Sequence, residues 1–352
     1  MTARSVTMPF PVRIRTELKL DPILLGIVTT LLLGGFVILA SASISISDTA
    51  VGNPFHYLER QLMAALIGGL AGGVCLFVPL QVWKTLGPLL LLAGLGLLFL
   101  VLMPGFGYEV NGAQRWIRLG VMNLQVSEPA RLCLILYLAG YLVRRSKDVR
   151  ERFVGFLRPM LLLSVACAAL LAEPDFGAAV VLLATALAML FVAGARIRDF
   201  LLFFLAAVGA MAALAIASPY RMKRLTGFLD PWADPYDSGF QLTQSLIAIG
   251  RGEWAGVGLG DSVQKLFYLP EAHTDFVFAV YAEEFGLLGS VVLIGLFLAL
   301  LWRVFGLAKK ASASERFFEA YFAIGIGTWL GLQAFINVGV NMGMLPTKGL
   351  TL

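Results

Sequence analysis

The chain has 352 residues, of which 59% are hydrophobic and 14% charged, and its formal net charge is +5. A soluble domain carries about 25% charged residues, so this composition excludes one, and the repeated apolar runs indicate a polytopic all-α membrane protein. The positive charge does not indicate a nucleic-acid-binding protein, because it is distributed as membrane topology requires.

The first 21 residues are basic and polar, and we expect them to form a cytoplasmic N-terminal tail. A single integral membrane domain should follow over residues 22–352. Its apolar runs predict nine spans, at about 22–42, 61–78, 86–103, 128–144, 157–172, 176–194, 200–218, 276–302 and 317–340.

Lys and Arg gather on one side of these spans, mainly in 1–21, 145–156, 195–199 and 303–316. The positive-inside rule places that side in the cytoplasm. Loop 104–127 and the long segment 219–275 then face outward. The final residues, from Pro346 to Leu352, are typical of the approach to another span, so we expect a tenth helix and a cytoplasmic tail beyond them.

Within segment 219–275, the stretch Gln241–Ile249 has the pattern of an amphipathic helix lying at the membrane interface. Gln244 lies on its polar face, and we predict that it binds substrate. The Gly-rich stretch after it, 250–260, lacks the preceding strand and the Gly-Lys-Ser/Thr ending of a phosphate loop. We interpret this stretch as a flexible turn against the membrane surface.

Asp275 precedes the eighth predicted span, in a polar loop that also carries Lys265, Glu271 and His273. A carboxylate there suits a helix cap. It also suits a general base, which needs a titratable group at a partly buried site. The neighbouring imidazole and lysine favour chemistry, and we predict that Asp275 is catalytic and that Lys265 and His273 bind substrate.

Glu128 and Arg131 lie three residues apart at the start of the fourth predicted span, where they share a helix face. An ion pair that only holds the helix end is one interpretation. Ionisable residues within spans usually face a cavity or a partner. We therefore favour a substrate-binding role.

Glu173 and Asp175 flank Pro174 in the tight turn between the fifth and sixth predicted spans. Two carboxylates there suit an ordinary turn, but they could also hold Mg²⁺ or Mn²⁺ together with substrate phosphates. We count Asp175 among the substrate-binding candidates and both residues as metal candidates. No organic cofactor is expected.

The outward segments also carry cations, against the positive-inside trend. They need an external anion, either lipid headgroups or a lipid-linked pyrophosphate. The residues are Arg115, Arg118, Arg221, Lys223, Arg224, Arg251, Lys265 and Lys348. Among these, we predict that Arg115, Lys265 and Lys348 bind substrate.

Five segments together resemble the SEDS family (shape, elongation, division and sporulation), and most closely its division branch. They are Asn111–Trp116, Ser127–Arg131, Glu173–Gly177, Asp230–Pro235 and Pro270–Phe276. The resemblance covers nearly the whole chain. Arg131 departs from the pattern, since many members have Lys there, which changes hydrogen-bond geometry while keeping the charge.

The resemblance implies ten transmembrane helices, a fold similar to GT-C glycosyltransferases, and polymerisation of lipid II into glycan strands at the periplasmic face of the bacterial inner membrane, at the division septum. It implies that the aspartate matching Asp275 is essential. It also implies partners, namely a class B penicillin-binding protein (an FtsI-type transpeptidase), FtsQ, FtsL, FtsB and FtsN, alongside membrane lipids and no nucleic acid.

Two other functions fit the same sequence. A lipid II flippase would suit ten helices with Glu128 and Arg131 inside them, but it needs a polar pathway across the whole bilayer, and few charges lie in the cytoplasmic half of the predicted spans. A scaffold that only recruits the transpeptidase would need no catalytic carboxylate.

Overall fold

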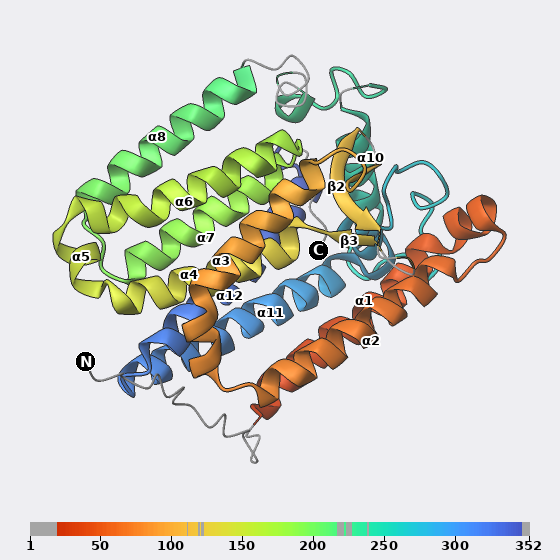
Figure 1. The fold of residues 1–352 in the computed structure, drawn as a ribbon. Coiled ribbons are helices and arrows are strands. Elements are labelled where there is room, and N and C mark those ends of the chain that lie inside the picture. Colours follow the sequence, from red (N-terminus) through yellow and green to blue (C-terminus); the bar gives the residue numbers. More distant parts are fainter. Residues whose placement is uncertain are drawn as a thin grey trace, which may run out of the picture.

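A computed structural model describes residues 20–110, 112–118, 120, 123–216, 222, 227–237 and 239–346 (Figure 1). Most of the predicted N-terminal tail therefore lies outside the described residues. So does Lys348, one of the predicted substrate-binding residues.

A helix stands at each of the nine predicted spans. These helices are α1 (Pro22–Val51), α2 (His56–Phe77), α3 (Leu80–Leu102), α4 (Ser127–Arg144), α6 (Phe153–Ala172), α7 (Phe176–Val192), α8 (Ile197–Ile216), α11 (Val277–Ala313) and α12 (Phe317–Asn341). By length and composition, α1, α2, α3, α6, α11 and α12 could each cross a membrane, and α7 is apolar but has only 17 residues. A multi-pass membrane protein is thus supported, while the span count stays a prediction.

Apolar side chains cover both the inside and the outside of this bundle. No residue of α2 is buried, and Leu66, Leu70 and Val74 of that helix are each about two-thirds exposed. A helix whose exposed face is apolar is suited to contact with lipid, because lipid covers apolar side chains that the protein does not bury. Two shorter helices are α5 (Ser146–Glu151) and α10 (Phe240–Arg251).

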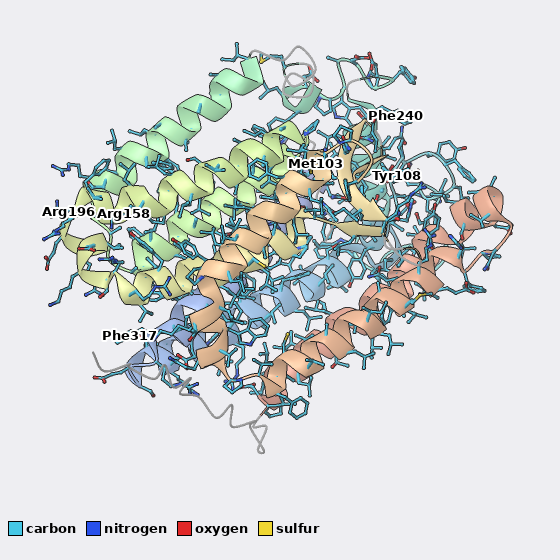
Figure 2. All side chains as sticks on the ribbon, viewed as in Figure 1. Met103, Tyr108, Arg158, Arg196, Phe240 and Phe317 are labelled. Atoms are coloured by element: carbon cyan, nitrogen blue, oxygen red, sulfur yellow. The ribbon has the colours of Figure 1, made fainter. Side chains whose placement is uncertain are left out.

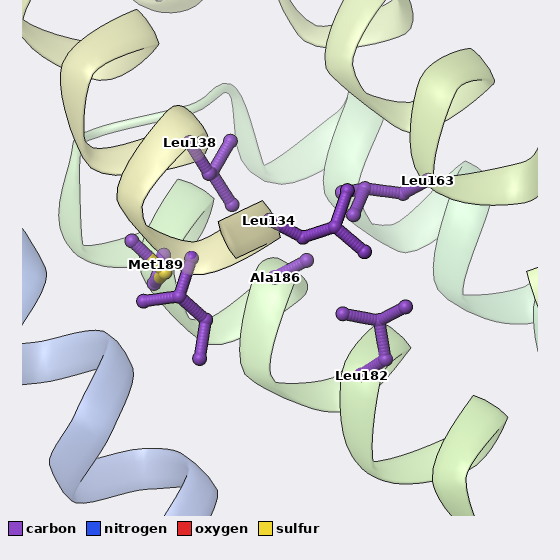
Figure 3. A pocket seen from close by; sticks show the side chains of 7 residues that line it. Leu134, Leu138, Leu163, Leu182, Ala186 and Met189 are labelled. Atoms are coloured by element: carbon purple, nitrogen blue, oxygen red, sulfur yellow. The ribbon is translucent and has the colours of Figure 1, made fainter. Parts of the chain in front are cut away.

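The interior between α4, α6 and α7 is closed and apolar. Figure 3 shows the side chains there, and all of them are hydrocarbon or thioether groups that leave no measurable room for a water molecule. This packing resembles the core of a soluble protein. The lining residues are Leu134, Ile135, Leu138, Leu163, Leu182, Ala186 and Met189.

The predicted helical fold is confirmed, and segment 104–127 adds a small antiparallel sheet to it. Its strands are β1 (Tyr108–Val110), β2 (Ala113–Arg118) and β3 (Asn123–Gln125), in the order β1-β2-β3. In the register, Trp116 of β2 lies opposite Tyr108 on one side and Gln125 on the other. Strands β1 and β3 have only three residues each, too few to show a period-2 pattern, and the sequence of β2 does not alternate strictly between apolar and polar residues.

The side chains labelled in Figure 2 mark the two ends of the bundle. Arg158, Arg196 and Phe317 lie toward one end, whereas Met103, Tyr108 and Phe240 lie toward the other. This separation agrees with the predicted alternation of cytoplasmic and outward segments. At its start, α1 is tied to α11, because Arg303 donates to both carboxylate oxygens of Asp21.

Helix α11 is broken at Gly286, whose φ of 67° and ψ of −163° are not helical. Backbone groups of the Gly-rich stretch fill the break: Val257 N–H donates to the carbonyl of Glu283, and Leu287 N–H donates to that of Glu253. The stretch thus packs on α11, and its expected position at the membrane surface stays a prediction. The helix also continues to Ala313, well past the predicted end at 302.

Candidate active site before helix α11

Asp275 is half-buried, two residues before the first residue of α11. Its backbone carbonyl accepts hydrogen bonds from the side-chain amides of Asn337 (2.9 Å) and Asn341 (3.1 Å), both on α12. The capping position of α11 is Phe276, and the N–H of Ala279 in its first turn donates to Oδ1 of Asn341. A capping acceptor for this helix thus comes from α12.

The loop that delivers Asp275 is a tight turn built on Glu271. The backbone N–H groups of Thr274 and Phe276 both donate to the Glu271 carbonyl at 3.1 Å, and Thr274 Oγ1 donates to its carboxylate at 2.6 Å. Leu269 and Ala272 are buried beneath the turn. A turn fixed by backbone bonds and two buried anchors holds the adjoining carboxylate in a defined place.

His273 lies in the same turn, with its ring centroid 4.7 Å from that of Tyr57 on α2. Its Nδ1 is buried and has no hydrogen-bond partner among the described residues. Burial lowers the pKa of His273, against a smaller opposite effect of Glu271. His273 is therefore a neutral imidazole at pH 7, which can donate or accept a proton but does not bring a fixed positive charge.

Lys265 is buried, and its charge is compensated within the protein. Nζ lies 2.7 Å from Oε1 of Glu284 and 2.8 Å from Oγ of Ser41 on α1, and Ser41 also donates to Glu284. This lysine therefore ties the loop to α1 and α11.

Glu283, the neighbour of Glu284, holds the segment before Lys265. One oxygen accepts from Arg251 and from the N–H of Val263, and the other accepts from Ser262 Oγ and the N–H of Gln264. Arg251 is thereby also paired. Each of the two glutamates is thus paired with a specific cation, Glu283 with Arg251 and Glu284 with Lys265.

The predicted helix around Gln244 exists as α10, but it packs on α11 and α12. Gln244 is half-buried. Its neighbour Ser245 is buried and donates to the backbone carbonyl of Asn341 at 2.8 Å. The polar face of α10 therefore contacts the end of α12.

A second polar group lies at the start of α4. Arg131 forms an ion pair with Glu128 at 3.2 Å, and the side chain of Arg131 is 1% exposed while that of Glu128 is 36% exposed. The guanidinium carbon lies 5.1 Å from the ring centre of Trp329 on α12. Nε and Nη2 of Arg131 are buried and have no partner among the described residues. Two donors thus stay available at a buried cation.

Arg115 of β2 supports the turn between α6 and α7. Its guanidinium donates to the backbone carbonyls of Glu173 (3.3 Å) and Pro174 (2.8 Å). Arg118 lies over the Tyr108 ring, with its guanidinium carbon 3.4 Å from the centroid. Of the two arginines of β2, Arg115 therefore hydrogen-bonds to the turn and Arg118 stacks on the Tyr108 ring.

The metal candidates do not fit a resident cation. Asp175 Oδ1 accepts the N–H of Ala178 and caps α7. Burial, helped by the nearby Asp175 charge, raises the pKa of Glu173 to about 8, so this carboxyl is neutral at pH 7. No group of three or more metal-ligating side chains occurs in the described chain. A cation cage needs charged carboxylates with free oxygens.

Helix α12 contacts both polar groups. Trp329 lies beside Arg131, while Asn337 and Asn341 hold Asp275. Our sequence reasoning missed Asn337, Asn341 and Ser41. Two asparagines one turn apart in an apolar run were a usable signal, because polar residues within spans are costly and seldom lack a role.

Comparison with known proteins gives the family. A family model described as "Cell cycle protein", which covers FtsW, RodA and SpoVE, matches residues 22–352. The chain belongs to the FtsW/RodA/SpoVE family. The SEDS resemblance is thus confirmed.

The similarity to other members of the FtsW/RodA/SpoVE family is high. "Probable peptidoglycan glycosyltransferase FtsW" of Thioalkalivibrio sulfidiphilus is 56% identical over 340 residues, which are 97% of this chain and 85% of that protein. The protein of the same name from Nitrosococcus halophilus is 57% identical over 334 residues, covering 94% and 86%.

Solved structures of family members share the fold. A chain of a structure described as "Structural coordination of polymerization and crosslinking by a peptidoglycan synthase complex" matches with a TM-score of 0.78 at 34% identity, covering 96% of this chain and 91% of that one. RodA of Thermus thermophilus matches with a TM-score of 0.70 at 32% identity, covering 96% and 90%.

Proposed function

We propose that this protein is a peptidoglycan glycosyltransferase that polymerises lipid II, with Asp275 as the general base. The single observation that carries the assignment of Asp275 is its placement: a half-buried carboxylate in a turn fixed by Glu271 and clamped to α12. A general base needs a carboxylate held in one place at a site that substrate can reach. The names of the FtsW relatives support the reaction class.

The proposed reaction is a single inverting displacement. Asp275 accepts the proton of the 4-hydroxyl on the acceptor lipid II sugar, and that oxygen forms a bond to the anomeric carbon of the growing strand. The bond from the anomeric carbon to the undecaprenyl pyrophosphate breaks, and the pyrophosphate leaves with the electron pair. A fixed cation at the leaving oxygen lowers the barrier by stabilising charge that develops there.

Arg131 is the best candidate for that cation. It is buried, and two of its nitrogens have no hydrogen-bond partner among the described residues. The half-exposed Glu128 orients it through their ion pair. Arg115 lies at the neighbouring turn and supports the same role. Lys265 is less suited to this role because Glu284 already compensates its charge.

The protein works in this proposal in the bacterial inner membrane, at the division septum, with its active site facing the periplasm. A class B penicillin-binding protein of the FtsI type would crosslink the strands, and FtsQ, FtsL, FtsB and FtsN would complete the assembly. A transpeptidase partner is supported by the similarity to a chain of a peptidoglycan synthase complex in which polymerisation and crosslinking are coordinated.

The decisive test is lipid II polymerisation by the purified protein with its penicillin-binding partner. We expect Asp275→Asn to abolish glycan strands while lipid II still binds, because the amide cannot accept the proton. Asp261→Asn is the matched control, since Asp261 is an exposed carboxylate of the same segment. Retention of most polymerisation by Asp275→Asn would overturn the assignment.

A flippase remains the rival function. The apolar, closed packing between α4, α6 and α7 argues against a polar headgroup pathway there. Proteoliposomes carrying labelled lipid II separate the two functions. We expect strand synthesis from lipid II supplied in the outer leaflet and no protein-dependent transfer between leaflets, whereas transfer without polymerisation would favour the flippase.

A further inference from the structure

The outer end of α12 carries two asparagines that are almost fully buried, Asn337 and Asn341, with exposed fractions of 1% and 0%. They lie one helical turn apart, so their side chains share a face. Both side-chain amides donate to one acceptor, the backbone carbonyl of Asp275. A carbonyl oxygen has two lone pairs, so this pair of donors saturates it.

Asn341 joins four segments at this point. Its Nδ2 donates to the Asp275 carbonyl and also to the backbone carbonyl of Asn337 at 2.9 Å. Its Oδ1 accepts the N–H of Ala279 in the first turn of α11. Its own backbone carbonyl accepts from Ser245 of α10. The peptide that follows Asp275 is therefore bonded to α12 on one side and leads into a helix that α12 also caps.

These hydrogen bonds affect the orientation of the Asp275 side chain as well as the stability of the fold. Holding the carbonyl fixes the peptide plane after Asp275. Together with the turn bonds of Thr274 and Phe276 to Glu271, it restricts the backbone that carries the Asp275 side chain. Buried amides are costly unless they are hydrogen-bonded, and here two of them converge on one catalytic-loop carbonyl. A displacement of about 1 Å at a reacting group can cost on the order of 100-fold in rate.

We propose that Asn337 and Asn341 are positioning residues, which act on the reaction by fixing the backbone of Asp275. The inference rests on the proposed role of Asp275 as general base. Neither asparagine touches the substrate in this proposal. The expected signature is a fall in kcat with little change in KM, because substrate binding is untouched while the base is misplaced.

Two variants test this in the purified complex with lipid II. Asn337→Leu removes one donor to the Asp275 carbonyl and leaves Asn341 in place. Asn341→Asp keeps the size of the side chain and an acceptor for the Ala279 N–H, but removes the donor. We expect each to lower kcat roughly 10- to 100-fold with KM within about threefold. Thr328→Val, a polar-to-apolar change lower on α12, should leave both constants unchanged.

Folding is checked on the same samples by thermal unfolding and by co-purification of the penicillin-binding partner. A folded variant with unchanged kcat would overturn the proposal, and so would a fall in activity that is confined to KM. A purely structural role is excluded if Asn341→Asp unfolds within a few degrees of the parent protein yet loses kcat.

A double variant separates failure of this inference from failure of the proposed function. In an Asp275→Asn background, Asn337→Leu should cost less than about twofold in any residual rate, since residues that act through one another are not additive. If Asp275→Asn itself stays active, the general-base assignment fails. If Asp275→Asn is inactive but both asparagine variants keep kcat, only the positioning role fails.

Discussion

Nζ of Lys265 lies 2.7 Å from Oε1 of Glu284, and both side chains are buried where the loop before α11 meets α1. Oε2 of Glu284 has no partner among the described residues. The lysine is therefore the main compensation for a buried carboxylate.

We expect Lys265→Met to destabilise the protein by about 3–5 kcal/mol, because it leaves the buried Glu284 carboxyl group without a cation. Lys265→Met combined with Glu284→Gln should recover most of that loss, since both charges are then gone. Thermal unfolding in detergent measures both. We expect polymerisation to recover together with stability. A stable but inactive double variant would instead give Lys265 a direct role at the pyrophosphate.

Gly286 allows the break in α11, and its backbone is in a region that favours glycine. An added Cβ would clash with the N of Gly256 and would lie 2.7 Å from the O of Gly252. We expect Gly286→Ala to cost roughly 1–3 kcal/mol or more and to lower polymerisation, as measured by unfolding and strand synthesis. Gly295→Ala, lower in α11 with no atom near its Cβ position, should be tolerated.

Glu173 gives the protein a pH dependence of known sign. Its pKa is about 8 when folded, against an ordinary value of 4.5, so the folded state binds the extra proton between these values. Its contribution to stability is complete below pH 4.5 and is lost as the pH rises to about 8. The side chain of Glu173→Gln does not titrate, so the variant should not lose this stability as the pH rises. The variant should match the parent protein near pH 5 and unfold several degrees higher at pH 8, at roughly 2–4 °C per kcal/mol.

Magnesium should not stabilise the substrate-free protein. Asp175 is used as a helix cap and Glu173 is neutral at pH 7, so we expect thermal unfolding in about 1 mM EDTA and in about 5 mM Mg²⁺ to agree within about 1 °C. A saturable rise with Mg²⁺ that Asp175→Asn abolishes would show a resident site. Manganese provides the second cation for the same comparison.

The placement of Asp275 could be predicted from the sequence, since it follows from one boundary between a polar loop and an apolar run. The helices were predictable for the same reason: span-length apolar runs leave few alternatives in lipid. The prediction was weaker at boundaries set by tertiary contacts. Gly286 interrupts α11 through bonds with residues some 30 positions earlier, which no local pattern reports.

The partners of the site residues were not predictable. Asn337 and Asn341 meet Asp275 across 62 and 66 residues of sequence, and Ser41 meets Lys265 across 224. The cations show the same limit. From the sequence alone, we expected Arg251 and Lys265 to belong to a cationic surface that binds anions. In the structure they are paired with Glu283 and Glu284. Only the fold decides which charges stay uncompensated.

The two polar ties between α1 and α11, which lie side by side in Figure 1, have a shared consequence. Asp21 binds Arg303 at one end, and Ser41 meets Glu284 at the other. At 1.5 Å per residue these ties are roughly 30 Å apart along α1, which is about the thickness of a hydrocarbon layer. Sliding one helix along the other would break both ties at once. The two ties therefore fix the register of α1 against α11 over a length close to that of the apolar layer of a membrane.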